Sequence, residues 1–191
     1  MEEEIKNFFG NKWTRTEIDD HVVDRIVDNK SVIDVGCGFN PYKKFNPNLV
    51  GIDIVNEGAD VVCDILDYDA MGIKYDIAIC YGVLHFNSYD WIRERLEWVV
   101  NNTKPKSEIL MKVNPTRKEE LGFDMRTSDV VWFDKWNHGL AEHFADIYSL
   151  EISNWREWRN PYDNSLRLKF DYRKVWEVSG IEERDPFIYD G

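Results

Sequence analysis

The chain has 191 residues, of which 43% are hydrophobic, and its formal net charge is −12. This length favours one domain over residues 1–191, with enough apolar content for a core. Because phosphate neutralisation supplies most of the affinity in nonspecific nucleic-acid binding, the acidic balance argues against nucleic acid as a nonspecific partner. No apolar run approaches the ~20 residues that a membrane-spanning helix needs, so no membrane association is expected.

The first clear predicted element is a helix over residues 16–29. Thr16 and Asp19 have the spacing of a capping box, with Asp in place of the usual Glu. A stripe of apolar residues then follows at helical spacing, which predicts a helix packed against a sheet. The stripe consists of Ile18, Val22, Val23, Ile26 and Val27.

A β-branched run at residues 32–35 ends at a pair of glycines. The run is typical of a strand buried on both faces. Gly36 and Gly38 have no Cβ, so they let the backbone turn sharply and approach a ligand closely. The dinucleotide-binding fingerprint needs a third small residue, and this chain has Pro41 at that position. After Gly38 we expect one or two helical turns at most.

Two of the next three predicted strands end in an acid. The strand over residues 49–53 ends in Asp53, and the strand over residues 60–64 ends in Asp64. A further apolar strand covers residues 75–80. The carboxyl ends of parallel strands meet at one sheet edge, where a carboxylate is well placed to accept hydrogen bonds from ribose hydroxyls. The sequence therefore predicts a nucleotide-type site.

The second half of the chain is expected to complete the sheet. Strands that alternate with short helical connections predict parallel pairing, and the last two strands predict an antiparallel hairpin at the sheet edge. The expected bounds are 88–101 and 133–148 for helices, 108–114, 149–155 and 166–175 for strands, 104–107 and 160–164 for turns, and 116–130 for a polar excursion.

The run Asp34-Val35-Gly36-Cys37-Gly38, with an acid-terminated second strand after it, resembles motif I and the following acidic motif of class I S-adenosylmethionine-dependent methyltransferases, type 11-like. The resemblance covers residues 31–176. It implies an α/β, Rossmann-like fold with a seven-stranded, mostly parallel sheet of order 3-2-1-4-5-7-6, strand 7 antiparallel, and helices on both faces. It also implies methyl transfer from S-adenosylmethionine, with S-adenosylhomocysteine as product, to an O or N atom of a small-molecule or sugar-like acceptor.

The same resemblance implies cofactor-binding roles at matched positions. The glycine turn would pass beneath the methionine part of the cofactor, with the strand-one acid near its amino group. The acids that end strands two and three would bind the ribose and the adenine edge, and the residues after strand four would line the sulfonium side. The implied residues are Asp34, Gly36, Cys37, Gly38, Asp53, Ile54, Asp64, Ile65, Cys80, Tyr81 and Gly82.

His85 follows the fourth strand in Val83-Leu84-His85, a partial match to the Val-Leu-Glu-His of many family members. Two interpretations stay open. His85 is either a catalytic base, which predicts an acidic limb in the pH–rate profile near the usual histidine pKa of about 6.5, or a structural residue at a helix start. His138 and His143 are five positions apart, which is poor spacing for a metal pair on one helix face, and no metal site is predicted.

Aromatic and basic residues near the C-terminus also leave two interpretations open. The tryptophans fit core packing or an aromatic substrate pocket, and the basic residues fit a solvated hairpin face or a site for an anionic substrate. The tryptophans are Trp132, Trp136, Trp155 and Trp158. The basic residues are Arg156, Arg159, Arg167, Lys169, Arg173 and Lys174.

Two other functions stay open, and the cysteines and the N-terminus indicate the cellular compartment. A nicotinamide-dependent oxidoreductase or epimerase is the first alternative, opposed by Pro41, and a non-catalytic binding module with the same fold is the second. Three cysteines without a Cys-x-x-Cys pair are expected to be reduced, as in a cytoplasmic protein. The acidic N-terminus has the wrong charge for a signal peptide.

Overall fold

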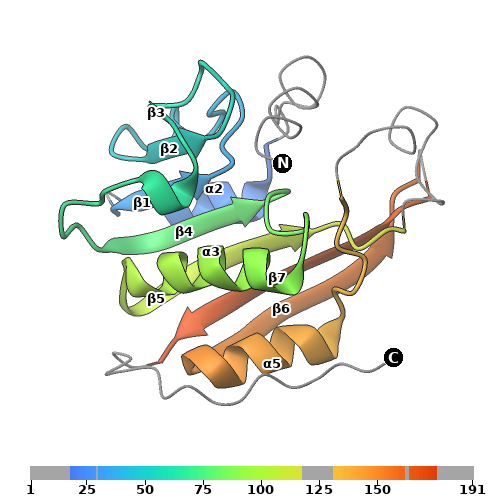
Figure 1. Cartoon of the computed structure of the whole chain (residues 1–191). Coiled ribbons are helices and arrows are strands. Elements are labelled where there is room, and N and C mark those ends of the chain that lie inside the picture. Colours follow the sequence, from blue (N-terminus) through green and yellow to red (C-terminus); the bar gives the residue numbers. More distant parts are fainter. Residues whose placement is uncertain (1–17, 29, 118–130, 162–163, 176–191) are drawn as a thin grey trace.

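The computed structural model of the chain describes residues 18–28, 30–117, 131–161 and 164–175. They form a seven-stranded sheet of order β3-β2-β1-β4-β5-β7-β6 (Figure 1). All pairs from β3 to β5 are parallel, whereas β7 runs antiparallel to both β5 and β6. The predicted strand order and the antiparallel seventh strand are confirmed.

The element bounds are as follows. The strands are β1 (Val32–Val35), β2 (Val50–Asp53), β3 (Val61–Val62), β4 (Tyr75–Tyr81), β5 (Thr103–Val113), β6 (Leu150–Arg159) and β7 (Leu166–Lys174). The helices are α2 (Asp20–Ile26), α3 (Tyr89–Asn101) and α5 (His138–Tyr148), with a short 3-10 helix, η1 (Ile65–Asp67).

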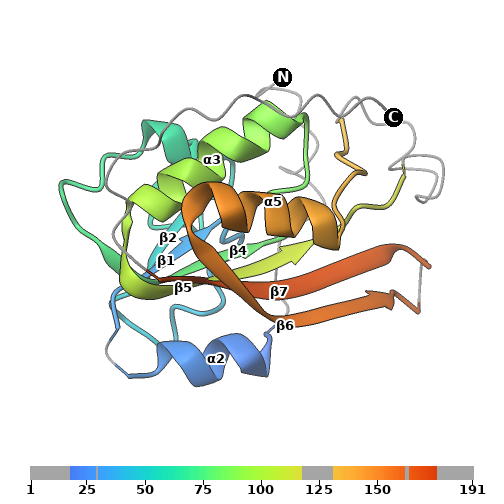
Figure 2. The same ribbon diagram turned by 90° about the horizontal axis from the view of Figure 1, so that it is seen from below.

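Helices cover both faces of the sheet. Figure 2 shows α3 and α5 on one face and α2 on the other. On the α2 face, Ile26 packs with Ile77 and Leu110. On the opposite face, Leu96 and Phe144 belong to the larger apolar core. All four residues of β1 are buried, which is the consequence of a central parallel strand with helices on both sides.

The N-terminal helix is shorter than the sequence pattern indicated. Its N-cap is Asp19, whose carboxylate accepts from the His21 amide, and the helix ends at Ile26. The expected capping residue Thr16 lies outside the described residues. After Gly38 the chain makes a series of turns without a regular helix, and Asn40 has φ 54°, outside the helical region.

Strand β5 begins earlier than expected, at Thr103. The predicted turn at 104–107 is an irregularity inside this strand, because the register with β4 passes from Tyr75–Thr103 to Ile77–Glu108. Helix α5 begins at His138 rather than at 133, since the Asn137 side chain accepts from the Leu140 amide and caps it there. Most of the predicted polar excursion, residues 118–130, lies outside the described residues.

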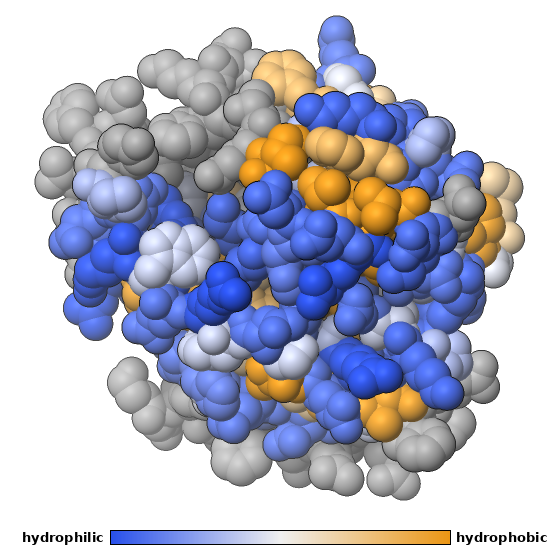
Figure 3. All heavy atoms as spheres, turned by 180° about the vertical axis from the view of Figure 1, so that it is seen from behind, coloured by the Kyte–Doolittle hydropathy of each residue, from blue (hydrophilic) through white to orange (hydrophobic). Residues whose placement is uncertain are grey.

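The surface opposite the view of Figure 1 is mainly polar, with apolar side chains in small groups (Figure 3). All three cysteines are free, and Cys37 and Cys80 are buried. Across the described parts of the chain, no helix has the length and hydropathy needed to cross a membrane.

Candidate functional site

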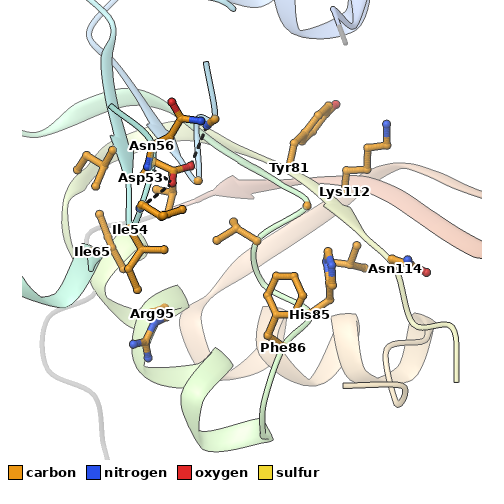
Figure 4. Close-up of a pocket in the computed structure, with 18 of the residues that line it drawn as sticks. Asp53, Ile54, Asn56, Ile65, Tyr81, His85, Phe86, Arg95, Lys112 and Asn114 are labelled. Atoms are coloured by element: carbon orange, nitrogen blue, oxygen red, sulfur yellow. Dashed lines mark hydrogen bonds between the residues drawn. The ribbon is translucent and has the colours of Figure 1, made fainter. Parts of the chain in front are cut away.

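A cavity of about 380 Å³ opens at the carboxyl edge of the parallel strands. Its walls come from the loops after β1, β2, β3 and β4 and from the ends of β5 and β7 (Figure 4). The predicted site residues that line it are Gly36, Gly38, Asp53, Ile54, Asp64, Ile65, Tyr81, Gly82 and His85.

Three predicted residues lie beneath the cavity wall rather than on it. The side chains of Asp34, Cys37 and Cys80 are fully buried. The Cys37 amide donates to the Ile52 carbonyl, which ties the turn after β1 to strand β2. These residues can therefore shape the cavity floor, and a direct ligand contact by their side chains stays a prediction.

The glycine turn after β1 requires residues without a Cβ. Gly36 has φ 66° and Gly38 has φ 59°, in the left-handed region. A Cβ added at Gly36 would lie 2.9 Å from the Val83 Cβ, so the turn also packs too tightly for a side chain. Gly82 has φ 76° and no heavy atom within 4 Å of its Cβ position, so its backbone borders open space.

Asp53 connects the ends of β1 and β2. One carboxylate oxygen, Oδ2, accepts from the Gly38 amide at 2.9 Å. The other, Oδ1, accepts from the amides of Val55 and Asn56 at 3.0 Å each. A carboxylate has about four acceptor positions. The described residues fill three of them, so Oδ2 retains one position for a ligand, and Asn56 lies beside it on the cavity wall (Figure 4).

Asp64 forms a buried ion pair that sequence reasoning missed. Its Oδ2 accepts from Arg95 of α3, and its Oδ1 accepts from the Leu66 amide. The Arg95 guanidinium also lies over the Trp91 ring, 3.8 Å from its centroid. Arg95 is 6% exposed and lines the cavity. The sequence carried one sign of this ion pair, because Arg95 is a charged residue among the apolar positions of the predicted helix at 88–101.

His85 is 4% exposed and stacks on Trp132, with ring centroids 5.3 Å apart and an interplanar angle of 15°. Its Nδ1 has no hydrogen-bond partner among the described residues. Burial, and secondarily the charge of Arg167, lowers the pKa of His85 to about 3. The imidazole is therefore neutral at ordinary pH, and any acidic limb from this group is expected well below the pH 6.5 of an unperturbed histidine.

Two lysines lie near the Tyr81 ring, and Figure 4 shows Tyr81 and Lys112 on the side of the cavity away from Asp53. The Nζ atoms of Lys112 and Lys169 lie 5.9 and 5.8 Å from the Tyr81 ring centroid. Lys169 donates to both carboxylate oxygens of Asp19, at 2.7 and 2.9 Å. Although burial opposes it, this pairing with Lys169 holds the pKa of Asp19 below its usual value. The sequence did not indicate that Asp19, Lys112 or Asn114 lines the cavity.

The structure puts the aromatic and basic residues of the last third of the chain in different environments: some line the cavity, some are buried and some are exposed. Trp132 lines the cavity, whereas Trp136 is buried and donates to the Leu84 carbonyl. Arg167 also lines the cavity, and Lys174 is buried with bonds to main-chain carbonyls. The remaining basic residues in this group, Arg156, Arg159 and Arg173, are exposed. Among the described residues there is no cluster of three or more side chains suited to a metal ion.

Comparisons with known proteins give similarity at the level of structure. The sequence matches no protein-family model and no curated protein. Magnesium protoporphyrin IX methyltransferase (ChlM) from Synechocystis PCC 6803, with bound S-adenosylmethionine, has a TM-score of 0.64 at 12% identity, covering 91% of this chain and 97% of that chain. The chain has the class I methyltransferase fold.

Two further structures with this methyltransferase fold were solved with S-adenosylhomocysteine. The N-methyltransferase NodS from Bradyrhizobium japonicum WM9 has a TM-score of 0.58 at 13% identity, covering 81% of this chain and 84% of that chain. The 1,6-didemethyltoxoflavin-N1-methyltransferase from Burkholderia thailandensis has a TM-score of 0.59 at 15% identity, covering 77% of this chain and 72% of that chain. At such identities the shared feature is the fold. In an open α/β sheet this fold puts a cavity at the carboxyl ends of the strands.

Proposed function

We propose that this protein is a methyltransferase that uses S-adenosylmethionine to methylate an O or N atom of a small-molecule acceptor. The observation that carries the proposal is the position of Asp53. Its carboxylate ends β2, accepts from the amide of the positive-φ glycine Gly38, and retains one acceptor position toward the cavity. A ribose hydroxyl fits such a position, as in other open α/β sheets that bind nucleotides.

The remaining residues near Asp53 fit the chemistry of this cofactor. Ile54 and Ile65 offer apolar walls for an adenine ring. Asp64 and Asn56 offer polar atoms at the ring edge and the ribose. Gly82, with open space where a Cβ would lie, lets the backbone come close to a sulfonium group.

When bound, S-adenosylmethionine supplies an electrophilic methyl group. The residues of this chain would contribute position and a dry environment, the terms that dominate when the acceptor is already nucleophilic. His85, buried and neutral, is available to accept a proton through one ring nitrogen. The turns that surround the cofactor would be held in shape by three buried side chains beneath them, those of Asp34, Cys37 and Cys80.

The test is a comparison of ligands by thermal unfolding and calorimetry. At roughly a hundredfold excess over Kd, S-adenosylhomocysteine should stabilise the fold by about 2.7 kcal/mol. Each kcal/mol raises the melting temperature of a chain of this size by roughly 2–4 °C. NAD and NADP should give no shift.

A shift with NAD alone would overturn the proposal in favour of the oxidoreductase alternative. The non-catalytic alternative predicts binding without turnover. It is tested by transfer of a radiolabelled methyl group from S-adenosylmethionine to small-molecule extracts. Labelled product with the wild-type protein and none with Asp53→Ala would support the enzyme.

A further inference from the structure

Aromatic side chains gather on one wall of the cavity. They come from the segment after β4, from the start of α3 and from the segment before α5. The residues are His85, Phe86, Trp91 and Trp132, and all of them line the cavity. Figure 4 shows His85 on the side of the cavity away from Asp53, the proposed ribose site. The wall is therefore placed to contact an acceptor rather than the ribose.

Main-chain hydrogen bonds hold Trp132 at this wall. Phe86 and Trp132 form an isolated antiparallel β-bridge. On one side of the bridge the Phe133 amide donates to the His85 carbonyl at 3.0 Å, and a second bond of 2.8 Å joins the two segments on the other side. Because hydrogen bonds flank the bridge on both sides, the backbone of Trp132 is fixed next to His85 before a ligand binds.

The rings of the wall form an uncharged surface. His85 and Trp132 stack, with ring centroids 5.3 Å apart and an interplanar angle of 15°. Phe86 packs against both rings, with centroid distances of 4.3 and 4.9 Å. The burial that lowers the pKa of His85 keeps its imidazole neutral. Trp132 is only half-buried, so part of its indole remains open for contact with a ligand.

Two ring nitrogens of this wall have no hydrogen bond to lose when a ligand covers it. His85 Nδ1 and Trp132 Nε1 are buried, and neither has a hydrogen-bond partner among the described residues. The wall is therefore desolvated at these atoms and offers mainly π and dispersion contacts. The cavity, at about 380 Å³, has the size of a small-molecule site. A small planar ring matches these features.

We infer that the methyl acceptor is a planar aromatic molecule whose ring packs against the wall formed by His85 and Trp132; this inference rests on the proposed methyltransferase function. Aromatic pairs with centroids about 4.5–7 Å apart are favourable beyond the apolar area that they bury. A saturated ring of similar size has no π face, so the wall distinguishes the two. Stacking also holds an O or N substituent at the edge of the ring, in a defined direction relative to the cofactor.

The experiment measures binding of uncharged aromatic probes and their saturated counterparts to the protein saturated with S-adenosylhomocysteine. The pairs are phenol and cyclohexanol, benzamide and cyclohexanecarboxamide, and benzyl alcohol and cyclohexylmethanol, with affinities from ligand-observed NMR titration. At least one aromatic probe should bind about fivefold or more tightly than its counterpart. Trp132→Leu, which keeps an apolar side chain without a ring, should reduce that ratio at least about twofold. It should leave the affinity for S-adenosylhomocysteine unchanged.

Two matched variants serve as controls. Trp132→Phe keeps a ring at the wall and should retain most of the preference. Trp158→Leu removes a tryptophan that is exposed on β6 and should retain all of it.

Three results would overturn the inference. The first is equal affinity within every pair in the wild-type protein, or no binding by any aromatic probe. The second is a preference that survives Trp132→Leu in full. The third is weaker binding of S-adenosylhomocysteine to Trp132→Leu with an unchanged probe preference, since the wall would then contact the cofactor. Failure of S-adenosylhomocysteine to bind the wild-type protein would instead overturn the proposed function.

Discussion

Asp53 both supports the turns around the cavity and faces its interior. The sequence indicated a carboxylate at a strand tip, and in the structure this carboxylate accepts three backbone hydrogen bonds. Asp53→Ala should therefore lower the free energy of unfolding by about 1–3 kcal/mol, because three partly buried amides lose their acceptor. It should also weaken binding of S-adenosylhomocysteine by about 1.5–3 kcal/mol.

Asp53→Asn is the matched control for that prediction. One amide oxygen can still accept from Val55 and Asn56, while the amide nitrogen meets the Gly38 N–H in place of an acceptor. This variant should lose less stability than Asp53→Ala. Urea unfolding and calorimetry measure the two effects separately. Unchanged affinity in both variants would show that the ribose does not bind here.

The second prediction at the residue scale concerns whether the buried, neutral imidazole of His85 takes part in catalysis. If it accepts a proton from the acceptor, His85→Phe should lower kcat about a hundredfold or more and leave cofactor affinity nearly unchanged. Phenylalanine keeps the aromatic stack with Trp132. Because the folded-state pKa is about 3, the wild-type rate should show no His85 limb near pH 6.5 and lose activity from this group only as pH falls toward 3.

The steady-state rate over pH 5–9 checks this interpretation of His85. Since an imidazole of lowered pKa stays neutral in the folded state, an intact profile through pH 6 is expected. A fully active and stable His85→Phe protein would remove the residue from the mechanism. Positioning would then remain the main catalytic contribution.

At the scale of elements, helix α2 is attached to the sheet at its N-terminus by one ion pair. Lys169 of β7 donates twice to the N-cap residue Asp19. A second contact lies in the helix itself, where His21 Nε2 is 2.9 Å from Asp171 Oδ2. Asp19 also lines the cavity, so the position of the helix start affects the shape of the site.

We expect Lys169→Met to lower the free energy of unfolding by about 1–3 kcal/mol at pH 7, because it removes the charged donor of Asp19. The folded-state pKa of Asp19 lies below its unfolded value of 3.8. The stabilisation is therefore present above pH 3.8 and is lost as pH falls through the lower folded-state pKa. Urea unfolding of wild type and variant at pH 7 and pH 2.5 should show a smaller difference in stability at the lower pH.

Lys169→Arg is the control for the element-scale prediction, since it keeps the charge next to Asp19. It should recover most of the stability at pH 7. A gap between wild type and Lys169→Met that is equally large at pH 2.5 would mean that lost packing, rather than the ion pair, causes the effect.

At the scale of the whole molecule, the strand order brings residues from five strands to one edge of the sheet. Strands β1, β2 and β4 bring the glycine turn, Asp53 and Tyr81 together, and β5 and β7 add Lys112 and Arg167. The carboxyl ends of the parallel strands meet at this edge, so residues far apart in the sequence share one cavity.

The sequence by itself indicated the strands, the helices and the residues at the strand ends, and its resemblance to class I methyltransferases implied the strand order and the candidate cofactor residues. The indications depend on local signals: a β-branched run that ends in glycines, acids at strand tips, and apolar stripes at helical spacing. Each signal lies within one element and its adjoining turn. The fold was therefore predicted correctly, although α2, β5 and α5 begin at different residues from those expected.

Only the tertiary structure decided which side chains meet across elements. Arg95 reaches Asp64 over 31 positions, and Lys169 reaches Asp19 over 150. Burial lowers the pKa of His85 to about 3, so the ring stays neutral even in mild acid. Such contacts depend on strand register and helix position, which arise from packing of the whole chain, and no local pattern in the sequence carries that information.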